Sequence, residues 1–223
     1  MLEAFNFRVI WQYRALFLNG LWATAWMSAL GLLGALVVGL VACIGRLSGV
    51  KLFATAAGIY IEIIRSTPLL AQLYFFYFGL PSLGFRVTEL ETGIVALALN
   101  SGAYIAEIIR SGMKAIAYGQ IEAAIASGLT LPQRLWHIIL PQALSFTIPP
   151  LLGQAIVLVK DSALLSLISI FELTRAGQTL VSERFLPAEG FFTVALLYLV
   201  LYYVLKALSS YSHQRLTFYR QER

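Results

Sequence analysis

Charged residues are scarce in this 223-residue chain, and their scarcity excludes whole classes of protein. Only 12% of the residues are charged, whereas 59% are hydrophobic; a soluble domain carries about a quarter charged residues. A compact soluble fold of this length has too little interior to bury so much apolar surface, and a disordered chain requires low hydrophobicity. The composition therefore predicts an integral membrane protein.

Cysteine and the common catalytic motifs are also nearly or wholly absent. The single cysteine, Cys43, excludes an intrachain disulfide and a cysteine metal cluster. The two histidines, His137 and His213, stand far apart. The sequence contains no G-x-x-x-x-G-K-[ST] phosphate-binding motif and no recognisable hydrolase motif. We therefore expect no catalytic residues, no metal site and no cofactor bound by this chain itself.

What the chain has instead is long apolar stretches, and a helix of about 20 mostly apolar residues crosses a bilayer. The candidate spans are residues 15–45, 52–80, 92–112, 138–159 and 190–212. Glu62 and Arg65 interrupt the second. The apolar segment Ser162–Phe171 is too short to span, so we expect a short packed or re-entrant helix there. The sequence thus predicts an all-α integral membrane fold with about five transmembrane helices.

The basic residues predict how these spans are oriented, because Lys and Arg concentrate in cytoplasmic loops. With the N-terminus outside, most basic residues lie inside. The inner residues are Arg46, Lys51, Arg110, Lys114, Arg134, Lys206, Arg215, Arg220 and Arg223; the outer ones are Arg8, Arg14, Arg86, Arg175 and Arg184. Arg8 and Arg14 oppose the rule. The net charge of +5 is better explained by this orientation than by nucleic-acid binding, which we do not expect.

Three regions follow from this division of the chain. Residues 1–17 mix aromatic with charged side chains and form either an interfacial helix or a simple flank of the first span. Residues 18–212 form the transmembrane domain, and residues 213–223 form a cytoplasmic tail.

The connection between the third and fourth spans, residues 111–137, is patterned. Good helix formers fill Gln120–Ser127, and Gly128 can end that helix in a left-handed conformation. Thr130 is a candidate N-cap, followed by Pro132 where a missing N–H is harmless. The pattern predicts a helix, a glycine turn and a second helix on the cytoplasmic face. The segment is either a surface linker or a docking element for a cytoplasmic partner.

This segment also resembles a known family. The pattern EAA-x3-G-x9-I-x-LP, the EAA loop of ABC-type importer permeases, matches at every stated position. The matching residues are Glu122, Ala123, Ala124, Gly128, Ile138, Leu140 and Pro141. In that family the loop contains the coupling helix, which binds the ATP-binding subunit and transmits ATP-driven closure. The resemblance implies that role for Glu122, Ala123, Ala124 and Gly128, with Leu140 and Pro141 at the membrane entry.

Further motifs resemble the polar amino-acid uptake branch of these permeases. They are residues 65–69 (RSTPL), 100–110 (NSGAYIAEIIR), 160–164 (KDSAL) and 172–175 (ELTR). The resemblance covers most of the chain and implies the permease subunit of an ATP-driven, binding-protein-dependent amino-acid importer in the bacterial inner membrane. The implied partners are two cytoplasmic ATP-binding subunits, a second permease subunit and an extracytoplasmic amino-acid-binding protein, together with membrane lipid. ATP would be bound by the partner subunits.

Polar residues at membrane depth are candidates for the substrate path, because a charge there is costly unless it is paired or faces water. An amino acid carries an ammonium and a carboxylate, so its site needs an acid and a base. The candidate residues are Glu62, Arg65, Ser66, Thr67, Asn100, Lys160 and Asp161. By resemblance, Arg65 and Thr67 lie near the substrate carboxylate and Asp161 faces a cationic group. Pro68 breaks the helix beside them and frees backbone carbonyls.

Each candidate also has a structural alternative. Glu62 and Arg65, three residues apart, share a helix face and could simply pair. Asn100 could form a hydrogen bond between helices, and Lys160 and Asp161 could be solvated at the outer interface. At the level of the whole chain, the alternatives are an integral membrane enzyme that uses acidic and basic groups of this set, or an ion-coupled carrier without an ATPase partner. The EAA loop argues against both.

Overall fold

Helices account for the regular structure of this protein. The computed structural model describes residues 8–221, with side chains described up to residue 211, and no strand occurs in that part of the chain. The α-helices are α1 (Arg8–Gln12), α2 (Arg14–Leu47), α3 (Lys51–Ser66), α4 (Leu69–Tyr74), α5 (Leu80–Ser82), α6 (Glu89–Lys114), α7 (Tyr118–Ala126), α8 (Leu131–Arg134), α9 (Leu140–Asp161), α10 (Leu173–Arg184) and α11 (Pro187–Gln221). The π-helical turns η2 (Phe75–Gly79) and η3 (Leu135–Ile139) and the 3-10 helix η4 (Ser162–Ile168) lie between them. The prediction of an all-α fold is confirmed.

Four helical segments in the described part of the chain are long and apolar enough to cross a membrane. They are Arg14–Leu47, Glu89–Lys114, Leu131–Ile168 and Pro187–Tyr211. They correspond to the first, third, fourth and fifth predicted spans. The third of these segments is continuous from α8 through η3 and α9 to η4, so the predicted fourth span is part of a much longer helical segment.

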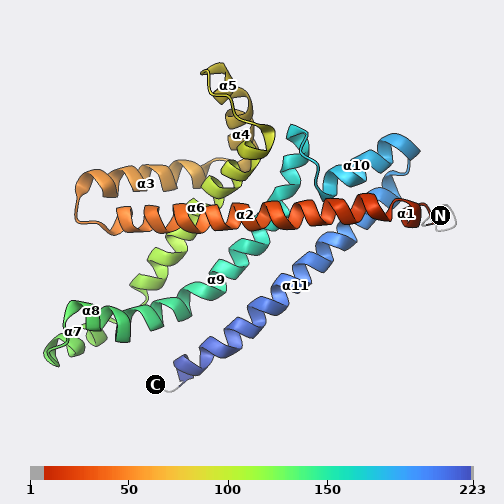
Figure 1. Ribbon diagram of the computed structural model, residues 1–223. Helices are drawn as coiled ribbons and strands as arrows, with labels where there is room; N and C mark the ends of the chain where they lie inside the picture. Colours follow the sequence, from red (N-terminus) through yellow and green to blue (C-terminus); the bar gives the residue numbers. More distant parts are fainter. Residues whose placement is uncertain (1–7, 222–223) are drawn as a thin grey trace.

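The second predicted span, residues 52–80, is not one continuous helix. Thr67 is extended (φ −119°, ψ 143°) and ends α3, as expected for a residue that precedes proline. Pro68 has no backbone N–H with which to continue the helix. Figure 1 shows α3 running beside α2, whereas α4 and α5 turn away from it. The chain therefore has a break in helical structure next to Arg65, at a place where the sequence predicted one.

Packing of α2 against α6 forms the centre of the molecule. Figure 1 shows α2 crossing α6 and α9. A Cβ atom at Gly39 would lie 2.5 Å from Ile105 Cγ2, so the glycine allows the two helices to approach closely. The core around this contact includes Met27, Leu97, Ile105, Leu158 and Leu165.

The outer surface is apolar along the candidate spans. Leu33, Val37 and Val41 on α2 are at least 60% exposed, and Val200 and Val204 on α11 are more than half exposed. A monomeric soluble protein rarely exposes an apolar surface of this extent. The surface is instead suited to lipid or to a second membrane subunit.

The short apolar segment after α9 folds as a packed element. Ser162–Ile168 forms the 3-10 helix η4, in which Leu165 and Ile168 are buried. Ser169 then adopts a left-handed conformation (φ 66°). The chain turns there into α10. The prediction of a short packed helix is confirmed.

The two predicted end regions are described only in part. In the predicted interfacial segment 1–17, residues 1–7 lie outside the described residues. The rest forms α1 and the start of α2, separated at Tyr13. In the predicted tail 213–223, α11 continues to Gln221, and residues 222–223 lie outside the described residues.

Candidate functional site

The segment that carries the EAA pattern folds as a helix, a glycine turn and a second helix. The first helix is α7, and Gly128 follows it with φ +74°. The Gly128 N–H donates to the Ile125 carbonyl at 2.9 Å, and the Leu129 N–H donates to the Ala124 carbonyl at 3.1 Å. These two bonds are the Schellman pattern, which requires a left-handed residue and favours glycine. The predicted helix stop at Gly128 is confirmed.

The second helix of this segment begins at the predicted cap. The Gln133 side-chain oxygen accepts hydrogen bonds from the Thr130 backbone N–H (2.8 Å) and hydroxyl (2.9 Å), which completes a capping box. The wide π-helical turn η3 follows, and the Leu140 N–H donates to the Leu135 carbonyl. Pro141 comes next and lacks an N–H, so regular α-helical bonding cannot continue through it.

The residues of the EAA pattern differ in exposure. Glu122, Ala123 and Gly128 are exposed, whereas Ala124 is buried and Leu140 is partly buried. Ala124 is therefore covered by this chain itself, unlike Glu122 and Ala123, for which the resemblance implies the same role. Figure 1 shows α7 and α8 at one end of the molecule, beside the end of α6 and the start of the helical segment that contains α9. A hydrogen bond from the Gln142 side-chain amide to that of Gln120 ties α7 to α9.

Exposed apolar residues in the same segment were missed in the sequence. Tyr118, Ile125, Leu131 and Trp136 are between 54% and 72% exposed. Large apolar residues in a connection that is predicted to lie on the cytoplasmic face could have indicated this exposed apolar surface. Together with the exposed Glu122 they give the segment a surface that is largely apolar and carries one acidic residue.

A second polar site lies where α3 meets α6. Arg65 Nη1 is 3.8 Å from Glu107 Oε2, and its guanidinium lies over the Tyr104 ring at 5.3 Å. Arg110 forms two hydrogen bonds to the same carboxylate, at 2.8 and 2.6 Å, a strong bidentate geometry. Glu107 and Arg110, three residues apart on one helix face, thus form an ion pair. Glu107 therefore joins a basic residue of its own helix to one from α3.

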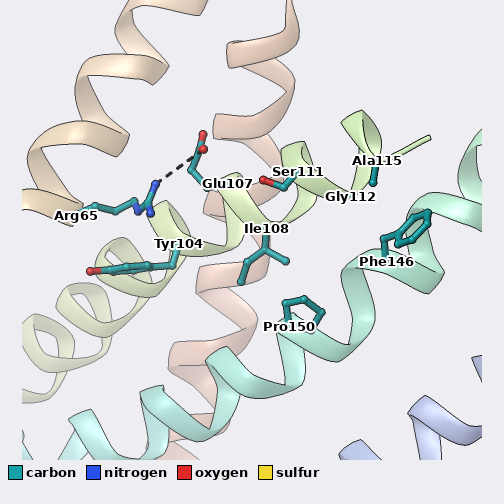
Figure 2. Close-up of a pocket in the computed structure, with 9 residues that line it drawn as sticks. All are labelled: Arg65, Tyr104, Glu107, Ile108, Ser111, Gly112, Ala115, Phe146 and Pro150. Atoms are coloured by element: carbon teal, nitrogen blue, oxygen red, sulfur yellow. Dashed lines mark ion pairs between the residues drawn. The ribbon is translucent and has the colours of Figure 1, made fainter. Parts of the chain in front are cut away.

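Two clefts open at these residues, and Arg65, Tyr104 and Glu107 line both. The first has a volume of about 470 Å³. Figure 2 shows Arg65 and Glu107 pointing toward one another in it, with Phe146 and Pro150 of α9 on the other side. The second has a volume of about 530 Å³. Its other lining residues include the acidic Glu62 and the hydroxyl-bearing Ser66.

Three of the predicted substrate-path residues are thus brought together at one cleft: Glu62, Arg65 and Ser66. Among the described residues, the ion pair that Arg65 makes is to Glu107 rather than to Glu62. Glu107 and Tyr104 belong to the motif quoted for the third span, but neither was predicted as a path residue. The sequence alone does not show that they face α3.

Thr67 and Asn100 belong to a hydrogen-bond cluster around the buried Gln72, in which Asn100 is buried and Thr67 is exposed. Asn100 donates to the Gln72 side-chain oxygen at 3.0 Å. The Gln72 amide in turn donates to the Thr67 hydroxyl at 2.8 Å and to the Ile64 carbonyl at 2.8 Å. The Ile64 carbonyl is four residues before Pro68 and so is the one that the proline leaves without its helical donor. The freed carbonyl is therefore bound by Gln72, a residue the sequence analysis missed.

Lys160 and Asp161 lie elsewhere. They end α9, about 16 Å along the helix from Pro150 at a rise of 1.5 Å per residue, and neither lines the two clefts. The predicted set is therefore not one cluster. It is divided into a cleft, an adjacent buried cluster and the far end of α9.

The ELTR stretch, residues 172–175, forms the N-terminal cap and first turn of α10. The buried carboxylate of Glu172 accepts hydrogen bonds from the Arg175 N–H at 2.6 Å and from the Tyr198 hydroxyl at 2.8 Å. The Leu173 N–H donates to the Thr24 hydroxyl at 3.1 Å. Burial raises the pKa of Glu172 above its ordinary value of 4.5, although the backbone N–H bonds act in the opposite direction. Glu172 therefore holds α10 against α11 and caps its first turn.

Comparison with known proteins places this architecture among transport components. Residues 31–218 match the family described as "binding-protein-dependent transport system inner membrane component". The chain is 39% identical over 203 residues to the glutamine transport system permease protein GlnP of Escherichia coli (strain K12), covering 90% of this chain and 93% of that protein. It is 34% identical to the arginine transport system permease protein ArtQ of Bacillus subtilis (strain 168), covering 84% and 86%.

Solved structures agree with these sequence relationships. A chain of a crystal structure described as "an amino acid ABC transporter with histidines" is 35% identical, with a TM-score of 0.91, covering 95% of this chain and 99% of that one. A chain of the MetNI methionine ABC transporter in an inward-facing conformation is 24% identical, with a TM-score of 0.75, and supports the fold alone. On the family match and the identity to GlnP, this chain belongs to the family of inner membrane components of binding-protein-dependent transport systems.

Proposed function

We propose that this chain is the permease subunit of an ATP-driven amino-acid importer and moves a polar amino acid by alternating access. Relatives named as glutamine and arginine permeases and a solved amino acid ABC transporter support the substrate class. One observation carries the mechanism: the EAA pattern forms an exposed, well-capped helix–turn–helix between two candidate spans.

The exposed face of this segment is proposed to bind the ATPase. Glu122, Ala123 and Gly128 would contact a cytoplasmic ATP-binding subunit, while Leu140 and Pro141 would join the segment to the membrane helix. Ala124, being buried, would hold the shape of the segment. Two such ATPase subunits would bind and hydrolyse ATP. Their closure would move the segment and, through α9 and its hydrogen bond to α7, the helices that line the clefts.

The clefts at Arg65 are proposed as part of the substrate path. The Arg65 guanidinium would bind the substrate carboxylate, and Glu62 would bind the ammonium group, with Ser66 as a further polar contact. Thr67 and Asn100 would hold the broken helix in place through Gln72. Lys160 and Asp161, at the far end of α9, would contact the amino acid elsewhere on its path, with Asp161 facing a cationic group.

The rest of the assembly follows from the family. A second permease subunit, identical or related, would face this one across the pathway, and an extracytoplasmic binding protein would deliver the amino acid. The N-terminus would lie outside and the C-terminus in the cytoplasm. ATP binding would favour the outward-facing state and hydrolysis would return it to the inward-facing state, since a ligand shifts a conformational equilibrium only by its differential affinity for the two states.

Reconstitution of the purified assembly in proteoliposomes tests this function. Amino-acid uptake should require ATP on the cytoplasmic side and should be lost in Glu122→Ala, while the ATPase continues to hydrolyse ATP. Uptake driven by an ion gradient without ATP would show an ion-coupled carrier instead. Chemical conversion of the amino acid would show a membrane enzyme.

A further inference from the structure

Two basic residues at the start of the chain are not used by the proposed transport function. Arg8 and Arg14 oppose the distribution of basic residues along the rest of the sequence. They lie on α1 and at the first residue of α2. Both are exposed, at the end of the molecule where α11 begins (Figure 1). An exposed arginine in this position can bind an anionic partner.

An apolar groove lies directly beside Arg14. It has a volume of about 540 Å³ and runs between α1 and the first turns of α11. Its lining residues are Ile10, Trp11, Arg14, Phe192, Thr193, Leu196 and Leu197. The Thr193 hydroxyl is bound to the Glu189 carbonyl. Among the described residues that line the groove, Arg14 is the one charged residue, and the rest of the lining is mainly hydrocarbon.

Local contacts hold Arg14 at the groove. Its Nη1 donates to the Trp11 carbonyl at 2.9 Å, and its guanidinium lies over the Trp11 ring at 5.1 Å. The break between α1 and α2 at Tyr13 allows this arrangement, and the Tyr13 hydroxyl is fixed by Glu183 and Arg184 of α10, each at 2.9 Å. A guanidinium has five N–H donors in a planar fork that matches phosphate oxygens. Within residues 8–211, the Trp11 carbonyl accepts from one of them, and the others can reach a ligand.

The groove also lies at the membrane–water interface, where a lipid headgroup could reach Arg14. Arg14 begins one candidate span and Pro187 begins another, so this end of the groove lies where two membrane helices start. Trp11 is 72% exposed, and tryptophan is enriched at the membrane–water interface. Leu196 and Leu197 lie roughly two and a half turns along α11 from Pro187 and so lie deeper in the hydrocarbon region.

We propose that this groove is a binding site for a phospholipid, with the headgroup phosphate on Arg14 and an acyl chain along Phe192, Leu196 and Leu197. A phosphate alone would leave the apolar lining unused, and an uncharged lipid would leave Arg14 unused. The lipid would hold α1 against α11 and so stabilise the start of two membrane helices. The proposal does not depend on which substrate is transported.

Native mass spectrometry of the purified full-length protein, with any partner subunits that co-purify, tests this site. Dioleoylphosphatidylglycerol is the probe. One basic residue near a lipid surface contributes about 1 kcal/mol, so Arg14→Gln should weaken binding about fivefold. Arg86→Gln removes an exposed arginine outside the groove. This variant should bind dioleoylphosphatidylglycerol as tightly as the unchanged protein does.

A second pair of variants tests the acyl chain and keeps Arg14. Leu196→Trp should fill the groove and reduce phosphatidylglycerol binding, while Leu208→Trp, at an exposed position further along α11, should not. Equal binding of dioleoylglycerol, which lacks the phosphate, would overturn the proposal. So would full displacement of the lipid by inorganic phosphate. Disulfide-linked dimers of Trp11→Cys in membranes would show that a second copy covers the groove and would also overturn it.

Discussion

The segment of α7 and α8 and the clefts at α3 and α6 are built in opposite ways. In the first, the shape-determining contacts are local: the Schellman turn at Gly128 and the capping box at Thr130 each join residues a few positions apart. In the second, Arg65 of α3 and Glu107 of α6 are 42 residues apart in the sequence. A local, exposed element can change its partner contacts with little effect on the fold. A long-range, partly buried one cannot.

This difference separates two roles that a transporter must couple. Variants in the exposed segment should alter energy transfer, and variants at the clefts should alter substrate affinity. Variants in the buried cluster beside the clefts should alter stability. The predictions below test this separation, beginning with the largest expected effect.

Replacement of Arg65 should affect substrate affinity most. A hydrogen bond to a charged group contributes about 1.5–3 kcal/mol, so Arg65→Ala should weaken amino-acid binding by roughly ten- to hundredfold. Arg65→Lys keeps the charge but not the planar fork of donors. Its affinity for the amino acid should lie between that of Arg65→Ala and that of the unchanged protein. Ligand binding to the purified assembly measures both. Unchanged affinity in Arg65→Ala would remove the cleft from the substrate path.

Replacement of Gly128 should weaken coupling and leave substrate affinity intact. A side chain in the left-handed region costs about 1–2 kcal/mol, so Gly128→Ala should weaken binding of the ATPase subunits by about tenfold. Gly84 also has a positive φ and open space around it, in the connection between α5 and α6. Gly84→Ala therefore carries the same strain away from the segment and should keep the ATPase bound. Equal loss in both variants would mean that strain, and not location, matters.

Loss of Asn100 should lower stability rather than either activity. Asn100→Ala would leave the Gln72 side-chain oxygen without its donor, at a cost of about 1–3 kcal/mol. Its buried neighbour Ser101 accepts one long hydrogen bond within the described residues, from the Gln154 amide at 3.3 Å. Ser101→Ala should therefore cost less. Thermal unfolding in detergent compares the two, and a larger effect at Ser101 would contradict the importance of the Gln72 cluster.

The smallest effect should be a pH dependence from Glu172. Its raised pKa means that the folded protein favours the protonated carboxyl. The contribution of Glu172 to stability is therefore fully present at a pH below the pKa of the unfolded state. It is lost as the pH rises through the raised pKa of the folded state. Glu172→Gln stays neutral and should flatten the change in melting temperature from acid to neutral pH. An unchanged profile would show that another group is responsible.

Much of the fold could be read from the sequence because its signals are local. Apolar length predicted the continuous spans, Pro68 predicted the break, and Gly128 and Thr130 predicted the turn and cap. The candidate site was only partly predictable, because it depends on how helices rotate against each other. That rotation brought Glu107 to Arg65 and turned Asn100 toward Gln72. Composition and spacing do not specify either of these two contacts.

The most direct test of the account compares Glu122→Ala with Arg65→Ala in the same reconstituted assembly, with ATP hydrolysis, uptake and substrate affinity measured together. Glu122→Ala should bind the amino acid normally and hydrolyse ATP without uptake. Arg65→Ala should keep the ATPase subunits and basal hydrolysis but lose substrate affinity. If both variants lost the same property, or if uptake in Glu122→Ala continued unchanged, the separation of coupling from substrate binding would be contradicted.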